Sequence, residues 1–81
     1  MTTNRVLLSI LLLFSEQIFA LGKSDIRSII EEEYPGARVT EIEKETYKDK
    51  KVYEIDFLHE GRRLEAIIST DGTIIKVDTD D

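Results

Sequence analysis

Carboxylates are the most numerous groups in this sequence that could do chemistry. The chain has 17 Asp and Glu residues against 11 Lys and Arg, which gives a net charge of −6 near neutral pH. Two neighbouring carboxylates can act as general acid and base when burial or repulsion raises the pKa of one of them. That chemistry also needs a site that excludes water, and the strand pattern below predicts a flat, open sheet for most of these groups. We therefore expect no acid–base catalysis from them.

Other catalytic groups are few. A nucleophilic mechanism needs a nucleophile held beside a base, and the chain's one histidine, His59, adjoins a predicted turn at Glu60-Gly61. Ser24, Ser28 and Ser69 have ordinary roles as a helix cap or as strand residues. The sequence has no glycine-rich phosphate loop and no cluster typical of zinc ligands. We expect a protein that is not an enzyme, with no catalytic residue, no metal site and no cofactor.

The N-terminal segment is typical of a signal peptide. Arg5 precedes an apolar run, Val6–Phe14, and a more polar stretch then ends in the small residue Ala20. The run is too short to span a bilayer, which needs about 20 apolar residues. We predict cleavage after Ala20, so that residues 1–20 are a signal peptide and residues 21–81 are a single domain of a periplasmic or secreted protein. The alternative is that the segment is kept as an N-terminal membrane anchor.

Charge and composition limit the partners of the exported domain. Its acidity argues against nucleic acids and anionic membrane surfaces, because clustered Lys and Arg side chains bind both. We expect no membrane contact after signal cleavage, and a basic partner is favoured instead. The chain has no cysteine, so a hydrophobic core without disulfides must stabilise this small domain.

One helix is predicted after the signal segment. Ser24 or Asp25 can cap its start, because their side-chain oxygens accept hydrogen bonds from the first turn. Tyr34-Pro35-Gly36 ends it, since proline disfavours the helical conformation in the residue before it. One face of this helix is apolar, because residues three or four positions apart lie on the same side. Its members are Ile26, Ile29, Ile30 and Tyr34.

Four strands are predicted after the helix. Apolar residues and alternation indicate strands at residues 38–47, 52–58, 63–69 and 73–78. The joints between these strands are expected at Asp49-Lys50, Glu60-Gly61 and Asp71-Gly72. The last two suit tight two-residue hairpin turns, which need positive φ.

The two tight turns predict which residues face each other. A turn at Glu60-Gly61 places Phe57 opposite Leu64, and a turn at Asp71-Gly72 places Ile68 opposite Ile75. Both turns bring apolar residues to one face, and a slip of one residue would turn every side chain to the other face. The helix should cover this face, which holds Tyr53, Ile55, Phe57, Leu64, Ala66, Ile68, Ile75 and Val77. We predict an α+β domain, with one N-terminal helix packed on a four-stranded antiparallel meander.

The opposite face of the predicted sheet is acidic. Asp56 lies opposite Glu65, and Glu65 lies opposite Asp78, so three carboxylates form a row across adjacent strands. Like charges in such positions destabilise a sheet, and Arg63 and Lys76 offset part of the repulsion from diagonal positions. A two-residue turn at Asp49-Lys50 would add Glu43 to this row. The next row would hold Glu45, Glu54, Ile67 and Lys76.

Four interpretations of this face follow from the sequence. It can be a solvated surface, the interface of a homodimer, or a weak site for a divalent cation, since carboxylate oxygens suit Ca²⁺. It can also bind a basic or mixed protein partner, because apolar side chains share the face with the charges. Those apolar side chains are Tyr47, Val52, Leu58, Ile67 and Ile74. We favour partner binding, for which the expected residues are Glu43, Glu45, Glu54, Asp56, Arg63, Glu65, Ile67, Lys76 and Asp78.

Short motifs in this order resemble a known family. They are Tyr34-Pro35-Gly36-Ala37, residues 52–57 (VYEIDF), Glu60-Gly61, Leu64-Glu65-Ala66 and Asp71-Gly72-Thr73-Ile74. The chain from about residue 24 to residue 79 resembles the PepSY and PepSY-like domains, including small periplasmic proteins folded like the β-lactamase inhibitor protein. The resemblance implies one helix before a four-stranded antiparallel sheet and an exported, non-catalytic role. It also implies inhibitory or regulatory binding to a peptidase or another extracytoplasmic protein.

Overall fold

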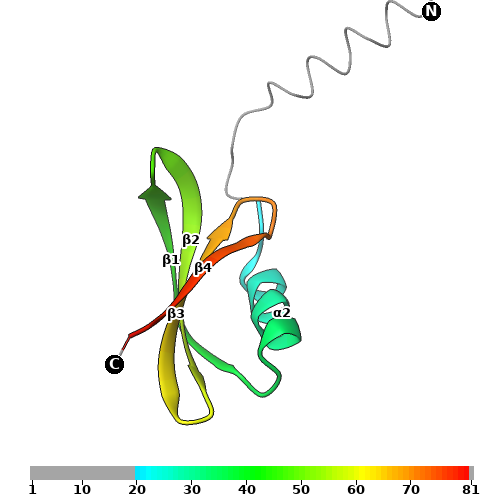
Figure 1. Ribbon diagram of the computed structural model, residues 1–81. Coiled ribbons are helices and arrows are strands. Elements are labelled where there is room, and N and C mark those ends of the chain that lie inside the picture. The colour runs from blue at the N-terminus through cyan, green and yellow to red at the C-terminus, as the bar shows by residue number, and fades with distance from the viewer. Residues whose placement is uncertain (1–19, 81) are drawn as a thin grey trace, which may run out of the picture.

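The computed structural model describes residues 20–80, which form one helix and one sheet. The elements are α2 (Lys23–Glu33), β1 (Arg38–Tyr47), β2 (Lys50–His59), β3 (Arg62–Ser69) and β4 (Ile74–Thr79). The strands lie in the order β1-β2-β3-β4 with antiparallel pairing, and α2 lies against one face of the sheet (Figure 1). The predicted α+β architecture is confirmed. The predicted signal peptide falls outside the described residues, apart from Ala20.

Helix α2 begins slightly earlier than the sequence predicts. Gly22 takes the N-cap position, and the Asp25 carboxylate accepts a hydrogen bond of 2.9 Å from the Gly22 backbone N–H. Asp25 therefore stabilises the helix start from within the first turn, where a negative charge also favours the helix dipole. The helix ends as predicted, at Tyr34, and Gly36 after it has a positive φ of 86°.

The core lies between α2 and the sheet. Ile26 and Ile30 project from the helix and are 1% and 0% exposed. They pack against the sheet face that the turns predicted to be apolar. The buried residues of that face are Tyr53, Ile55, Phe57, Ala66 and Ile68.

Aromatic contacts close one end of this core. The Tyr34 ring lies 5.1 Å from the Phe57 ring and 5.4 Å from the His59 ring, measured between centroids. His59 Nε2 also lies 3.1 Å from the carbonyl oxygen of Pro35. His59 thus joins the end of β2 to the connection that follows α2, which is a structural position.

Strands β2 and β3 pair in the predicted register. Glu60 and Gly61 both have positive φ values, 52° and 78°, as a type I′ turn requires. Phe57 lies opposite Leu64 as a result. The same register places Ile55 opposite Ala66 and Asp56 opposite Glu65.

The turn between β1 and β2 lies one residue earlier than predicted. Lys48 and Asp49 form it, with φ values of 50° and 65°. Moving a turn by one residue moves the strand pairing by two, so residues 41–47 of β1 keep the predicted faces. Glu43 consequently lies opposite Glu54, and Glu45 lies opposite Val52. The predictions that Glu43 lies in the row of Asp56 and Glu45 in the row of Glu54 were therefore wrong. A bulge between Val39 and Glu41 then shifts the register, and Val39 lies opposite Phe57 and packs against the core.

The connection between β3 and β4 is longer than the predicted two-residue turn. The Ser69 backbone N–H donates to the Thr73 carbonyl oxygen, which leaves residues 70–72 as the loop. Gly72 has a φ of 93°, so the predicted glycine does supply the left-handed residue.

This longer loop exchanges the positions of Ile74 and Ile75. Ile74 lies opposite Ile68 and packs against the core, whereas Ile75 is an extra, bulged residue that is 48% exposed. The prediction that Ile75 is a core residue opposite Ile68 was therefore wrong, as was the placement of Ile74 on the acidic face. After the bulge, Ala66 lies opposite Val77 as predicted.

Candidate functional site

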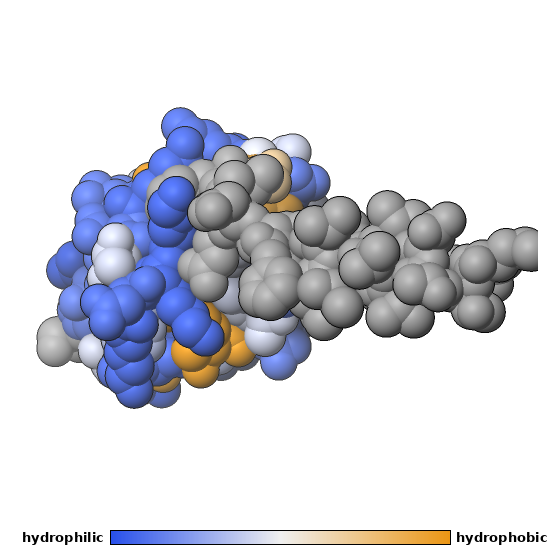
Figure 2. All heavy atoms as spheres, turned by 90° about the horizontal axis from the view of Figure 1, so that it is seen from above, coloured by the Kyte–Doolittle hydropathy of each residue, from blue (hydrophilic) through white to orange (hydrophobic). Residues whose placement is uncertain are grey.

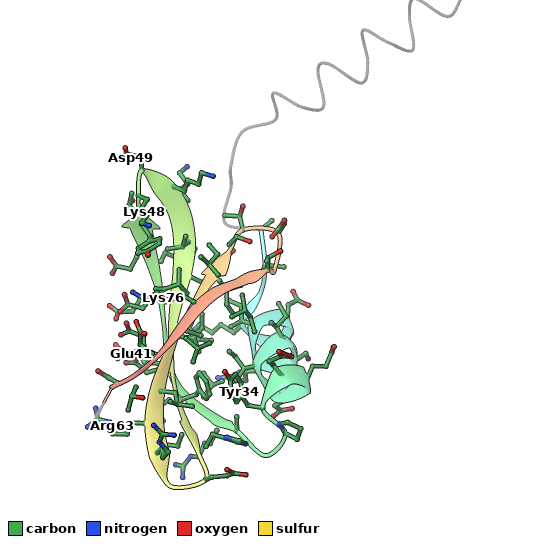
Figure 3. All side chains as sticks on the ribbon, viewed as in Figure 1. Tyr34, Glu41, Lys48, Asp49, Arg63 and Lys76 are labelled. Carbon is green, nitrogen blue, oxygen red and sulfur yellow. The ribbon has the colours of Figure 1, made fainter. Side chains whose placement is uncertain are left out.

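The face of the sheet that α2 leaves uncovered, called the open face below, carries all nine predicted site residues. They are Glu43, Glu45, Glu54, Asp56, Arg63, Glu65, Ile67, Lys76 and Asp78. Figure 3 shows the two sides of the sheet: Tyr34 lies between α2 and the strands, whereas Glu41, Arg63 and Lys76 lie on the side away from the helix.

Five carboxylates gather at the centre of the open face, and we call them the acidic patch. Its members are Glu41, Glu43, Glu54, Asp56 and Glu65. Glu41 lies opposite Asp56, Asp56 lies opposite Glu65, and Glu43 lies opposite Glu54 in the adjoining row. One carboxylate oxygen from each of Glu54, Asp56 and Glu65 lies within 4.8 Å of the other two. Sequence reasoning missed Glu41, because its place depends on the position of the β1–β2 turn.

Repulsion and burial raise pKa values within the acidic patch. The charge of Glu43 is the largest cause of the raised pKa of Glu41, followed by burial and the charge of Asp56. For Glu54 and Glu65, burial is the largest cause of the raised pKa, and neighbouring carboxylates raise it further. The folded protein therefore keeps this patch ionised at a cost in stability, and a cationic group from outside would reduce that cost.

Asp56 lies at the centre of the patch with part of its carboxylate unsatisfied. Its Oδ1 atom is buried and accepts no hydrogen bond from any group in residues 20–80. A buried acceptor without a donor costs about 1–3 kcal/mol. A donor supplied by a partner would therefore stabilise Asp56 as well as neutralise charge.

The acidic patch can be compared with the needs of a metal ion. Glu54, Asp56 and Glu65 are the residues close enough together to share a cation within the described part of the chain. Ca²⁺ takes about six to eight oxygen ligands, and three carboxylates on a sheet supply only part of that shell. The cluster alone does not define a metal site.

Two cationic residues of the open face pair with carboxylates in β4 or just after it. Lys76 Nζ lies 3.1 Å from Asp78 Oδ2, and the hydrogen bond and charge of Asp78 raise the pKa of Lys76. Arg63 lies 4.0 Å from Asp80 Oδ2. These two pairs neutralise charge at β4, at one edge of the sheet, while the centre of the patch stays acidic.

Two apolar residues of the open face are buried although no helix covers them. Val52 is 1% exposed and Ile67 is 7% exposed. The sheet twists strongly (Figure 1), and Lys76 Nζ of β4 comes within 6.0 Å of the Tyr47 ring of β1. The open face is therefore hollow at this end, and the two outer strands shield the apolar residues between them.

The described surface seen from the end of the molecule that carries the β1–β2 turn is mostly hydrophilic, with small hydrophobic areas (Figure 2). Within residues 20–80, no helix is long and apolar enough to cross a membrane.

Comparison with known proteins gives one match. Residues 20–78 match the family PepSY, described as "Peptidase propeptide and YPEB domain". No curated protein and no solved structure matches the chain. Membership of this family is consistent with a non-catalytic, regulatory module of the kind found in peptidase propeptides. Because the match spans α2 and almost all of the sheet, the resemblance expected from the motifs is confirmed, and the chain belongs to the PepSY family.

Proposed function

We propose that this chain is an exported, non-catalytic regulatory module that binds a basic segment of an extracytoplasmic protein through the acidic patch. The family description points to a peptidase as the kind of partner. The observation that carries the proposal is the group of three carboxylates within 4.8 Å of one another on a face that α2 leaves uncovered.

Two features of the patch support a cationic partner group. The pKa values of Glu41, Glu54 and Glu65 are raised, so their ionised forms are disfavoured in the free protein. Asp56 Oδ1 is a buried acceptor without a donor in the described chain. A Lys or Arg side chain brings both a positive charge and N–H donors, and charge-assisted hydrogen bonds are stronger than neutral ones.

Self-association through the same face is the second candidate, and the charges disfavour it. A two-fold dimer places the same surface patch of both copies in contact. Two acidic patches would then face each other, and such like-charge contacts cost several kcal/mol. A basic partner relieves the repulsion that a second copy would increase.

The proposal can be tested with a matched pair of charge variants. The patch variant is Glu54→Gln, Asp56→Asn and Glu65→Gln, and the control variant is Glu31→Gln, Glu32→Gln and Glu33→Gln on exposed residues of α2. Both raise the net charge by three. We expect the patch variant to bind an arginine-rich probe peptide at least about tenfold more weakly and with a flatter salt dependence.

The control variant should keep most of its affinity for the probe. An equal loss in both variants would mean that net charge alone attracts the peptide, which contradicts a site at the patch. The biological partner is sought by cross-linking the exported protein in envelope extract, followed by peptidase assays with and without it. Loss of the cross-linked product in the patch variant alone is the expected result.

A further inference from the structure

The hollow end of the open face, near the β1–β2 turn, forms a pocket. Its volume is about 390 Å³, which lies within the range of about 300–1,000 Å³ typical of ligand pockets. We call it the lysine pocket, and its lining residues are Tyr47, Lys48, Lys50, Val52, Ile75 and Lys76. A smaller hollow of about 230 Å³ adjoins it, sharing Lys50, Val52 and Ile75 and reaching the β3–β4 loop.

The lining of this pocket is apolar at Val52 and Ile75. Val52 is buried, and Ile75, at 48% exposed, is the single large apolar side chain exposed within residues 20–80. The bulge in β4 is what turns Ile75 outward. Bulges often re-aim a side chain at sites of function, and an exposed isoleucine beside a buried valine offers a partner's apolar group a place to be buried.

The rim of the pocket is cationic, in a chain whose net charge is −6. Lys48 Nζ lies 5.4 Å from the centroid of the Tyr47 ring, and Lys76 Nζ lies 6.0 Å from it. Lys76 is paired with Asp78, whereas Lys48 and Lys50 form no ion pair within residues 20–80. Figure 3 shows Lys48 at the tip of the hairpin and Lys76 further along the same face.

We propose that the lysine pocket binds an acidic peptide segment. An aliphatic or aromatic side chain of the peptide contacts Val52 and Ile75, and neighbouring carboxylates of the peptide contact Lys48 and Lys50. The charges select this occupant, because a basic or neutral apolar peptide would leave those lysines without counter-charges. The site is distinct from the acidic patch, which attracts the opposite charge.

Three probe peptides of equal length separate the parts of this proposal in an NMR titration of the ¹⁵N-labelled full chain. The first places a central Leu among Asp and Glu residues, the second has Gly in place of Leu, and the third places Leu among Lys residues. We expect the first to give saturable shifts centred on Tyr47, Val52 and Ile75. The second should bind several-fold more weakly, and the third should leave these three signals unchanged. Absence of saturation with the first probe, or shifts centred elsewhere, would overturn the proposal.

A matched pair of variants tests the cationic rim. Lys48→Asn with Lys50→Gln removes two charges at the pocket, and Asn suits the positive φ of position 48. The control, Lys23→Gln with Arg27→Gln, removes two charges from exposed positions on α2. We expect the pocket variant to bind the first probe about tenfold more weakly, as two exposed ion pairs allow, and the control to change by less than about threefold. Equal losses would contradict the site.

Two further variants complete the test. One tests the apolar contact of the probe with Ile75, and the other tests whether the lysine pocket binds independently of the acidic patch. Ile75→Ser should reduce the affinity for the leucine-containing acidic probe to that of the glycine probe, and an unchanged affinity would show that Ile75 makes no contact. The acidic-patch variant Glu54→Gln, Asp56→Asn and Glu65→Gln should bind the acidic probe at least as well as wild type. That last result would show that the lysine pocket binds the acidic probe without the acidic patch. The two proposals can therefore fail independently of each other.

Discussion

The hydroxyl of Tyr53 lies 2.9 Å from the backbone nitrogen of Leu21 and 3.4 Å from the carbonyl oxygen of the same residue. It accepts a hydrogen bond from the N–H and donates one to the C=O. The Tyr53 ring belongs to the core and is 1% exposed. One side chain of a central strand therefore holds the segment that enters α2, across 32 positions of sequence.

Tyr53→Phe should remove this connection and leave the ring packing in place. We expect the free energy of unfolding to fall by about 1 kcal/mol, the typical net value of a hydrogen bond. Urea unfolding measures the loss, and amide hydrogen exchange at Leu21 should become faster. An unchanged exchange rate at Leu21 would show that other contacts hold this segment.

Phe57→Ala should remove an aromatic contact between β2 and Tyr34 at the end of α2. Phe57 is 1% exposed and its ring meets Tyr34. Truncation of a buried Phe costs about 3–5 kcal/mol, which is most of the stability that a domain of this size has. The variant should be largely unfolded at room temperature by circular dichroism. A melting temperature within a few degrees of wild type would contradict the burial of this residue.

The exchange of Ile74 and Ile75 can be tested by a pair of identical substitutions. Ile74→Ala should destabilise the protein by about 1–2 kcal/mol, since Ile74 is half-buried against the core. Ile75→Ala, at an exposed bulge, should change the stability by no more than about 0.5 kcal/mol. Denaturant unfolding measures both losses. A larger loss for Ile75→Ala than for Ile74→Ala would support the register that the sequence predicted, with Ile75 in the core.

Glu65→Gln should make the isolated protein slightly more stable. Glu65 lies between Asp56 and Asp78 in the sheet, and each such repulsion costs some tenths of a kcal/mol. The gain should shrink in high salt, because screening weakens the repulsion that the substitution removes. A clear loss of stability at low salt would reveal a favourable contact of Glu65 that outweighs the repulsion.

The raised pKa values predict how stability depends on pH. Glu41, Glu54 and Glu65 have pKa values above the ordinary 4.5 in the folded protein, so the folded state binds protons more readily than the unfolded chain. Their contribution to stability is full below pH 4.5 and is lost as the pH rises through the raised values. Urea unfolding from pH 4.5 upward should show this fall, and Glu54→Gln with Glu65→Gln should reduce it.

Asp71 contributes to the pH dependence of stability with the opposite sign, and the same urea unfolding experiment can distinguish it. The Ser69 hydroxyl, followed by Thr73, holds the pKa of Asp71 below its ordinary value of 3.8. Its stabilising effect is present above pH 3.8 and is lost as the pH falls through the lowered value. Asp71→Asn should therefore affect the acid side of the profile and leave the fall above pH 4.5 unchanged.

The sequence by itself determined the helix, the four strands, the core face and the pairing of β2 with β3. The Glu60-Gly61 turn carries a strong signal, since glycine suits the positive φ that the turn needs. Once that turn is placed, alternation assigns Phe57 to the core and sets Asp56 opposite Glu65. The motifs around these residues also led to the correct family.

Only the tertiary structure decided the position of the β1–β2 turn, the length of the β3–β4 loop and the place of the bulge in β4. A turn of Lys48 and Asp49, two residues without strong turn preference as a pair, brought Glu41 into the acidic patch and moved Glu43 beside Glu54. The longer β3–β4 loop and its compensating bulge exposed Ile75. Alternation along β4 did not locate the bulge, because Ile74 and Ile75 are both apolar and the sequence alone does not decide which of them lies opposite Ile68.

The lysine pocket was likewise a product of the folded sheet. Its lining joins residues of β1, β2 and β4 with the β1–β2 turn, and it exists because the twist brings Lys76 toward Tyr47 across the buried Val52. Sheet twist arises in each strand and accumulates from one strand to the next. A linear pattern of polar and apolar residues specifies which face each side chain takes, and the curvature of that face depends on contacts between strands far apart in the chain.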